Sequence, residues 1–172
     1  MFWLQLTVYL ILIAGLLVFI IAFGIPFFRG APYAPTSPKG VRRMIDLAGI
    51  RPGMRTVDLG SGDGRIVIAL ARTGTQAEGF EINRVLVWWS RMRIRAAGLE
   101  DRATVHHRSI FDADLSQYDA ILLFGVFHMM EKLEEKLDAE AQPGTVIVSN
   151  LFRFPTWQPV HREGKLYVYE KK

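Results

Sequence analysis

Short apolar segments of strand length alternate with longer helical segments through most of this 172-residue chain. Parallel strands need crossover connections that are usually helices, so the alternation predicts an α/β sandwich with a mostly parallel sheet. The segment 118–124 is apolar almost throughout, as in a strand buried on both faces. We expect strands at 55–59, 76–81, 103–107, 118–124, 145–150 and, as an exposed edge strand, 165–170. We expect helices at 41–50, 64–72, 83–97 and 129–141.

The N-terminal residues 2–23 form a run without any charged side chain. As a helix this run would be about 33 Å long, enough to cross a hydrocarbon core of about 30 Å. A cleaved signal peptide would need a basic residue before a shorter apolar core of about 7–15 residues. No Lys or Arg precedes the run, so we expect a retained single-pass anchor over residues 1–28. The basic residues that follow predict a cytoplasmic location for the remaining domain.

Residues 29–40 contain three prolines and two glycines, which predicts a linker before a domain at 41–172. The chain has no cysteine, which excludes disulfides, Cys-ligated zinc and thiol catalysis. A net charge of +4 is too small to indicate a nucleic-acid partner. His106 and His107 point to opposite faces of an expected strand and cannot ligate one ion together. We therefore expect neither a metal nor a nucleic acid.

A glycine-rich loop, D-L-G-S-G-D-G-R at 58–65, follows the first expected strand and opens a helix. Its glycines permit a tight turn and a close approach of a ligand to the backbone. The N–H groups at the start of the helix suit an anionic group. A nicotinamide-binding loop would place its third glycine at position 65, where this chain has Arg65. The alternative is a purely structural turn in which Asp63 caps the helix.

Glu81 ends the second expected strand, 21 residues after Gly60. A carboxylate at this place can accept hydrogen bonds from both hydroxyls of a ribose. The alternative is a solvated glutamate at a strand end. Because the carboxyl ends of parallel strands form the ligand edge of such sheets, we expect the loop and Glu81 to share one site.

The G-x-G-x-G loop after Asp58 resembles motif I of class I methyltransferases that use S-adenosylmethionine. Five further stretches narrow the resemblance: P-Y-A-P-T at 32–36, E-I-N at 81–83, L-V-W-W-S-R at 86–91, F-G-V at 124–126 and F-R-F-P-T-W-Q-P at 152–159. Together they resemble the membrane-anchored protein-lysine methyltransferases that modify the ATP synthase c-subunit and the adenine nucleotide translocase, and their shorter prokaryotic relatives. The resemblance covers nearly the whole chain. The chain departs from the family pattern at Arg84 and at Phe127-His128, beside the expected substrate site.

The resemblance implies a Rossmann-like class I methyltransferase fold, S-adenosylmethionine as cofactor and a lysine side chain as methyl acceptor. Ser109 and Asp112 are the polar candidates near the adenine, although Ser109 has an equal alternative as a plain loop residue. The full set of expected cofactor-binding residues is Thr36, Asp58, Gly60, Ser61, Gly62, Asp63, Glu81, Asn83, Ser109, Asp112 and Phe124.

Methyl transfer to an amine needs orientation and a desolvated channel that lowers the pKa of the lysine. We therefore expect Tyr33, Phe124 and Gly125 as the catalytic residues. The Tyr33 hydroxyl could bond the amine or its ring could lie over the sulfonium, with packing of the linker as the alternative. We expect Trp88 and Trp89 to pack against the domain, with contact to a membrane surface as the alternative.

The predicted function is S-adenosylmethionine-dependent methylation of a lysine in a membrane or membrane-associated protein, with the lipid bilayer contacted through residues 2–23. Two alternatives stay open. The first is methylation of a lipid or quinone, and the second is a cofactor-binding membrane module without turnover. No D/N-P-P-Y element follows the fourth strand, which argues against the usual adenine, cytosine and glutamine N-methylating sites.

Overall fold

The computed structural model describes residues 2–19, 35–124 and 127–172. The chain divides into two compact units, Met1–Ala34 and Pro35–Lys172. The described part of the first unit is helix α1 (Phe2–Phe19), in which side chains 3–18 are exposed and uncharged. Among the described helices, none combines the length and the hydropathy required of a membrane span. The rest of the predicted anchor and the linker up to Ala34 lie outside the described residues.

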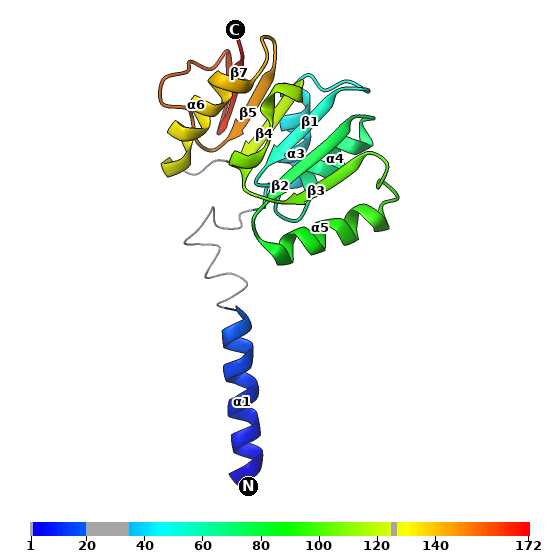
Figure 1. Cartoon of the computed structure of the whole chain (residues 1–172), viewed down its shortest axis with the longest axis vertical. Coiled ribbons are helices and arrows are strands. Elements are labelled where there is room, and N and C mark those ends of the chain that lie inside the picture. Colours follow the sequence, from blue (N-terminus) through cyan, green and yellow to red (C-terminus); the bar gives the residue numbers. More distant parts are fainter. Residues whose placement is uncertain (1, 20–34, 125–126) are drawn as a thin grey trace. The chain divides into compact units, whose positions relative to one another are not determined.

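The second unit is built on a seven-stranded sheet whose β1, β2, β3, β4 and β5 are mutually parallel (Figure 1). The strand order is β3 (Ala103–His107), β2 (Gln76–Glu81), β1 (Arg55–Leu59), β4 (Ala120–Phe124), β5 (Val146–Asn150), β7 (Leu166–Glu170) and β6 (His161–Glu163). The chain runs outward from β1 in one direction and from β4 in the other, so the order reverses between these two strands. Ligands of open α/β sheets bind at such a reversal, beyond the carboxyl ends of the strands. The predicted α/β class with a mostly parallel sheet is confirmed.

Helices cover the two faces of the sheet with separate apolar cores. One core joins α3 (Pro38–Leu47), α4 (Arg65–Arg72) and α5 (Arg84–Ala96) to one face through buried residues such as Met44, Leu70 and Ile94. The other joins α6 (Met130–Glu140) and short 3-10 turns to the opposite face. These turns are η2 (Ile110–Asp112) and η3 (Leu115–Gln117), whereas η4 (Phe127–Met129) precedes α6 and has no buried residue. Alternate residues of β4 supply both cores, since Leu122 belongs to the first and Leu123 to the second.

Helix α3 begins at Pro38, three residues before the expected start. The Ser37 hydroxyl accepts a hydrogen bond from the Gly40 N–H at 3.1 Å, and Pro38 occupies the first turn. Proline suits this position because its missing N–H would have no partner within the helix. The prolines of residues 29–40 led to the prediction of a linker up to residue 40. That prediction missed the helix start that Ser37 and Pro38 specify together.

The expectation that the last strand lies at the sheet edge was wrong. β7 lies between β5 and β6, and its Leu166, Val168 and Tyr169 are buried. The true edge strand, β6, has only three residues, and all are exposed. Such a strand has no apolar pattern to reveal it, and its turn to β7 depends on Gly164, which has a φ of 57°.

Glu134 of α6 holds the loop after β5 in place. Its buried carboxylate accepts hydrogen bonds from the Thr156 N–H at 3.0 Å, the Thr156 hydroxyl at 3.1 Å and the Trp157 N–H at 2.6 Å. The ring of Phe154 in this loop packs at 4.8 Å from that of Tyr169, whose hydroxyl accepts the Phe154 N–H. The F-x-F-P-x-W element thus closes the second core over α6.

Replacing Glu134 by alanine should lower the free energy of unfolding by about 1–3 kcal/mol, because donors in a partly buried loop lose their acceptor. The neighbouring exposed residue provides a control, since Glu135→Ala should change stability by less than about 0.5 kcal/mol. Urea unfolding followed by circular dichroism measures both. Equal stability of the two variants would show that Glu134 does not hold the loop.

Candidate functional site

The glycine loop between β1 and α4 turns through three left-handed glycines. Gly60, Gly62 and Gly64 have φ values of 87°, 52° and 75°. The N–H groups of Gly60 and Ser61 both donate to the Phe80 carbonyl, at 2.9 and 3.0 Å, which ties the loop to β2.

The surroundings of two of these glycines differ. A Cβ added to Gly64 would lie 2.7 Å from the Ser90 Cβ, so this glycine lets α4 start against α5. A Cβ added to Gly60 would meet no atom within 4 Å. The backbone at Gly60 therefore faces open space, as a loop that receives a ligand requires.

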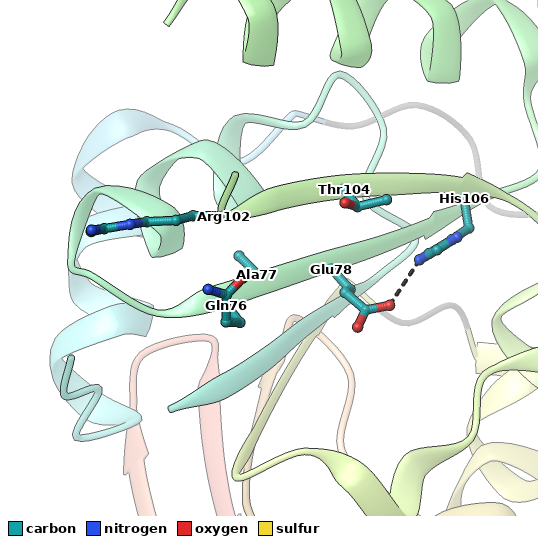
Figure 2. Close-up of a pocket in the computed structure, with 6 residues that line it drawn as sticks. All are labelled: Gln76, Ala77, Glu78, Arg102, Thr104 and His106. Carbon is teal, nitrogen blue, oxygen red and sulfur yellow. Dashed lines mark hydrogen bonds and ion pairs between the residues drawn. The ribbon is translucent and has the colours of Figure 1, made fainter. Parts of the chain in front are cut away.

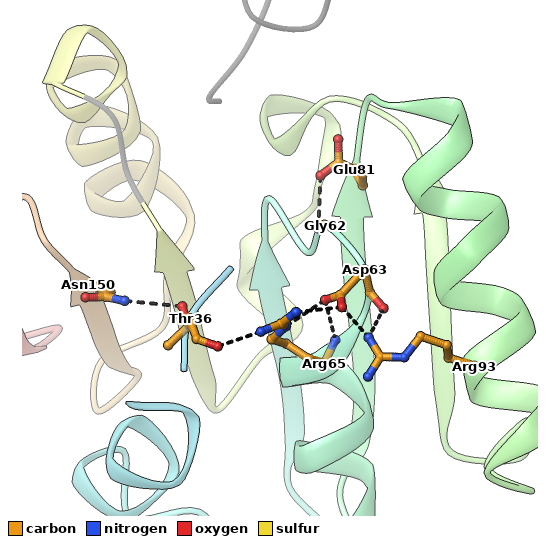
Figure 3. A network of polar contacts seen from close by, with 7 residues as sticks. All are labelled: Thr36, Gly62, Asp63, Arg65, Glu81, Arg93 and Asn150. Atoms are coloured by element: carbon orange, nitrogen blue, oxygen red, sulfur yellow. Dashed lines mark hydrogen bonds and ion pairs between the residues drawn. The ribbon is translucent and has the colours of Figure 1, made fainter. Parts of the chain in front are cut away.

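Glu81 lies against this loop at the carboxyl end of β2 (Figure 3). Its Oε2 accepts the Gly62 N–H at 3.0 Å and its Oε1 accepts the Asn83 N–H at 2.7 Å. Each carboxylate oxygen has two lone pairs, so each keeps acceptor capacity beyond these bonds. The structure thus brings Glu81 and the loop to one edge of the sheet, as the sequence predicted.

Two carboxylates of the loop, Asp58 and Asp63, have different electrostatic environments. Asp58 is 2% exposed, and burial, followed by the charges of Glu81 and Asp63, raises its pKa to about 8. Burial also opposes ionisation of Asp63, but a hydrogen bond from Arg65 and the charges of Arg93 and Arg65 bring its pKa below the usual value. A positively charged ligand beside Asp58 would lower the pKa of this carboxyl group and favour its ionised form.

Asp63 is the centre of a chain of polar contacts (Figure 3). Arg65 donates to both of its carboxylate oxygens at 2.9 Å, and Arg93 of α5 forms an ion pair with it. Arg65 also donates to the Thr36 carbonyl at 2.9 Å, and the Thr36 hydroxyl accepts from the Asn150 side chain at 3.3 Å. The carboxylate of Asp63 thus binds the side chains of Arg65 and Arg93. Hydrogen bonds with Arg65 and Asn150 hold Thr36 near the ends of β1 and β5.

Sequence reasoning missed the roles of Arg65, Arg93 and Asn150. Arg65 had a visible signal, because it stands where a dinucleotide-binding loop has glycine. Arg93 lies 30 residues from Asp63 along the chain, so only the packing of α5 reveals their contact.

The remaining predicted residues make local contacts at the same edge. Ser109 and Asp112 form a reciprocal cap of η2: Ser109 Oγ accepts the Phe111 N–H at 3.3 Å and Asp112 Oδ2 accepts the Ser109 N–H at 3.2 Å. Asn83 caps α5 by accepting the N–H groups of Val85 and Leu86.

Ser61 and Phe124 also lie at this edge. In the described part of the chain, the buried hydroxyl of Ser61 is a side-chain group without a hydrogen-bond partner. Phe124 ends β4, is half-buried and pairs in register with Asn150. Tyr33 and Gly125, the other two expected catalytic residues, lie outside the described residues.

A cavity of about 190 Å³ lies elsewhere, against β2 and β3 (Figure 2). Its lining consists of Gln76, Ala77, Glu78, Arg102, Thr104 and His106. Glu78 and His106 bond each other across it at 2.8 Å, and Arg55 lies 3.7 Å from Glu78. The cavity does not include the glycine loop or Glu81, so it is separate from the predicted cofactor site.

Comparison with known proteins identifies the family. A family model described as the ANTKMT methyltransferase domain matches residues 58–161. The ATP synthase C-subunit lysine N-methyltransferase of Mus musculus is 37% identical over 159 residues, which are 89% of this chain and 64% of that protein. A protein-lysine N-methyltransferase of Saccharolobus islandicus is 35% identical over 130 residues, 74% of this chain and 81% of that protein. This chain thus spans slightly less than two thirds of the mouse protein.

A solved structure shares the fold and holds the demethylated cofactor. It is described as an RNA methyltransferase from Salinibacter ruber in complex with S-adenosyl-L-homocysteine, with a TM-score of 0.77 and 34% identity. The alignment covers 80% of this chain and 93% of that one. The predicted class I methyltransferase fold and the predicted cofactor are confirmed, and the two curated relatives agree with the predicted enzyme class. The chain belongs to the ANTKMT methyltransferase domain family and uses S-adenosylmethionine.

Proposed function

We propose that this chain transfers the methyl group of S-adenosylmethionine to a lysine of a membrane-associated protein. The observation that carries the proposal is the contact of Glu81 with the glycine loop at the sheet reversal, in a chain whose curated relatives methylate lysine. When bound there, the cofactor supplies an electrophilic methyl group on a sulfonium.

The acidic edge suits this cofactor. Glu81 would accept the ribose hydroxyls, and the open backbone at Gly60 would lie along the methionine part. The sulfonium and the α-ammonium are cations, so the carboxylate of Asp58 near the loop would favour them. The unpartnered Ser61 hydroxyl is a further polar group at this place.

The acceptor lysine must lose its proton before transfer, and its ordinary pKa is about 10.4. A desolvated channel lowers that value and so provides the neutral amine. We propose that Phe124, at the end of β4, lines this channel together with Gly125, and that Tyr33 aligns the amine. Thr36, three residues after Tyr33, is held at this edge by Arg65 and Asn150, which supports a role for the linker in the site.

We also propose that residues 1–28 anchor the chain in a membrane, with the methyltransferase domain on the cytoplasmic side. The uncharged run at 2–23 and the exposed apolar side chains of α1 support this. A tether of this kind would raise the local concentration of a membrane-associated substrate.

The substrate class is tested by incubating the full chain with isolated membranes and S-adenosylmethionine labelled in its methyl group. We expect label in protein, released as methyl-lysine on acid hydrolysis. Label in the lipid fraction would favour the lipid or quinone alternative. Label in added RNA would indicate a substrate class like that of the Salinibacter ruber protein, which is described as an RNA methyltransferase. Either result would overturn the proposal.

Glu81→Ala should weaken binding of S-adenosylmethionine by about 10- to 150-fold, the equivalent of about 1.5–3 kcal/mol for hydrogen bonds to a charged group. Calorimetric titration measures the dissociation constant, and circular dichroism checks that the loop change leaves the domain folded. Glu100→Ala, at an exposed position, should bind as the parent chain does. An unchanged constant for Glu81→Ala would remove Glu81 from the site.

The raised pKa of Asp58 predicts that the cofactor-free protein loses stability as the pH rises. The unfolded chain releases this proton near pH 3.8 and the folded chain near pH 8, so Asp58 reduces stability increasingly as pH rises between these values. Asp58→Asn cannot ionise, so its unfolding temperature relative to the parent should rise from about pH 5 to about pH 9. Asp101→Asn, at an exposed site, serves as the control. Parallel pH profiles for parent and Asp58→Asn would contradict the assignment.

A further inference from the structure

Helix α5 and the residue pair before it present an exposed apolar surface. The surface consists of Ile82, Val85, Trp88, Trp89 and Met92, which are 37, 50, 61, 54 and 48% exposed. Their spacing of three and four places them on one side of the helix. Val87, Ser90 and Ile94, on the other side, are buried in the domain. The expectation that both tryptophans pack against the domain was therefore wrong, and we call this surface the α5 tryptophan face.

Arginine side chains flank the α5 tryptophan face. Residues 84–96 contain four arginines and no acidic residue. Arg91 donates twice to the Val105 carbonyl and Arg93 is paired with Asp63, so these two are fixed beside the helix. Arg84 and Arg95 are exposed, and Arg95 forms a solvent-exposed ion pair with Glu100 at 3.9 Å.

We propose that the α5 tryptophan face rests in the interfacial layer of a bilayer that contains anionic lipids. Tryptophan favours this layer because its ring is apolar and its N–H can bond to water or headgroups. A helix that exposes tryptophan and aliphatic side chains between arginines is typical of binding to anionic membrane surfaces. Two copies of the chain packed face to face on this surface would bring like charges together.

The surface is continuous with the cofactor site. Ile82 directly follows Glu81, and Asn83 caps α5 while its N–H donates to the Glu81 carboxylate. Figure 1 shows α5 beside β3, at one edge of the sheet. Seating of this face on lipid would therefore present the cofactor edge to a lysine at the membrane. This consequence rests on the proposed function, whereas the lipid contact itself does not.

The absence of cysteine allows a direct test, because a single introduced cysteine can be labelled without background. The full chain carrying Met92→Cys would be labelled with a polarity-sensitive fluorophore and reconstituted in phosphatidylcholine vesicles, with or without phosphatidylglycerol, that include brominated lipid. Glu135→Cys, exposed on α6, is the matched control. It shares the same tether but lies outside the α5 tryptophan face.

We expect a blue shift and quenching of the label at position 92, both increased by phosphatidylglycerol and reduced by salt, and neither change at position 135. Arg84→Gln with Arg95→Gln should remove the dependence on phosphatidylglycerol. Equal emission from both labels in all vesicles would overturn the proposal. Burial of the label at position 92 in the absence of lipid would also overturn the proposal. Such burial would be detected on raising the protein concentration, or on adding RNA or a substrate protein.

Titration of S-adenosylmethionine in the same samples separates the two proposals. Loss of lipid contact in the double variant Trp88→Ser, Trp89→Ser with unchanged cofactor binding and an unchanged unfolding temperature would support the assignment of this face. Unchanged quenching at position 92 in that variant would contradict it. Absence of methyl transfer in a chain that still shows the lipid contact would count against the proposed function alone.

Discussion

The buried carboxylate of Asp63 connects the parts of this site that lie far apart in the sequence. It pairs with Arg65 from its own loop and with Arg93 from α5, and Arg65 extends the connection to Thr36. A charge removed from water is costly unless it is paired and hydrogen-bonded, so the two arginines allow the loop to place it there. The position of the segment before α3 at the carboxyl edge of the sheet thus depends on the charge of Asp63.

Asp63 and Asp58 show how the same side chain serves two purposes within one loop. The arginines lower the pKa of Asp63 and keep it ionised, whereas burial and neighbouring carboxylates raise that of Asp58. Asp63 stabilises the loop through its ion pairs, whereas ionisation of Asp58 is costly unless a cation lies close to it. Sites of perturbed pKa often mark function because binding a ligand removes such a cost. The electrostatics therefore agree with a cofactor that carries a sulfonium and an ammonium.

The strands and most helices could be predicted because their apolar runs are bounded by turns, as with β4 and β5. Glu81 could be predicted from its separation from the glycine loop along the sequence. In the structure its carboxylate accepts a hydrogen bond from the N–H of Gly62 in that loop. β6 could not, since its three exposed residues have no pattern of their own. The partners of Asp63 and the exposure of Trp88 depend on how α5 packs on the sheet, which periodicity alone does not determine. The proposed roles of Tyr33 and Gly125 remain predictions.

The central claim is that the glycine loop and Glu81 form the cofactor site. Amide hydrogen exchange of the full chain with and without S-adenosyl-L-homocysteine tests it most directly, because exchange slows where a ligand covers or orders the backbone. We predict slower exchange at residues 58–65 and 81–83. Protection confined to the cavity lined by Glu78, Arg102 and His106, with none in the loop, would contradict the account.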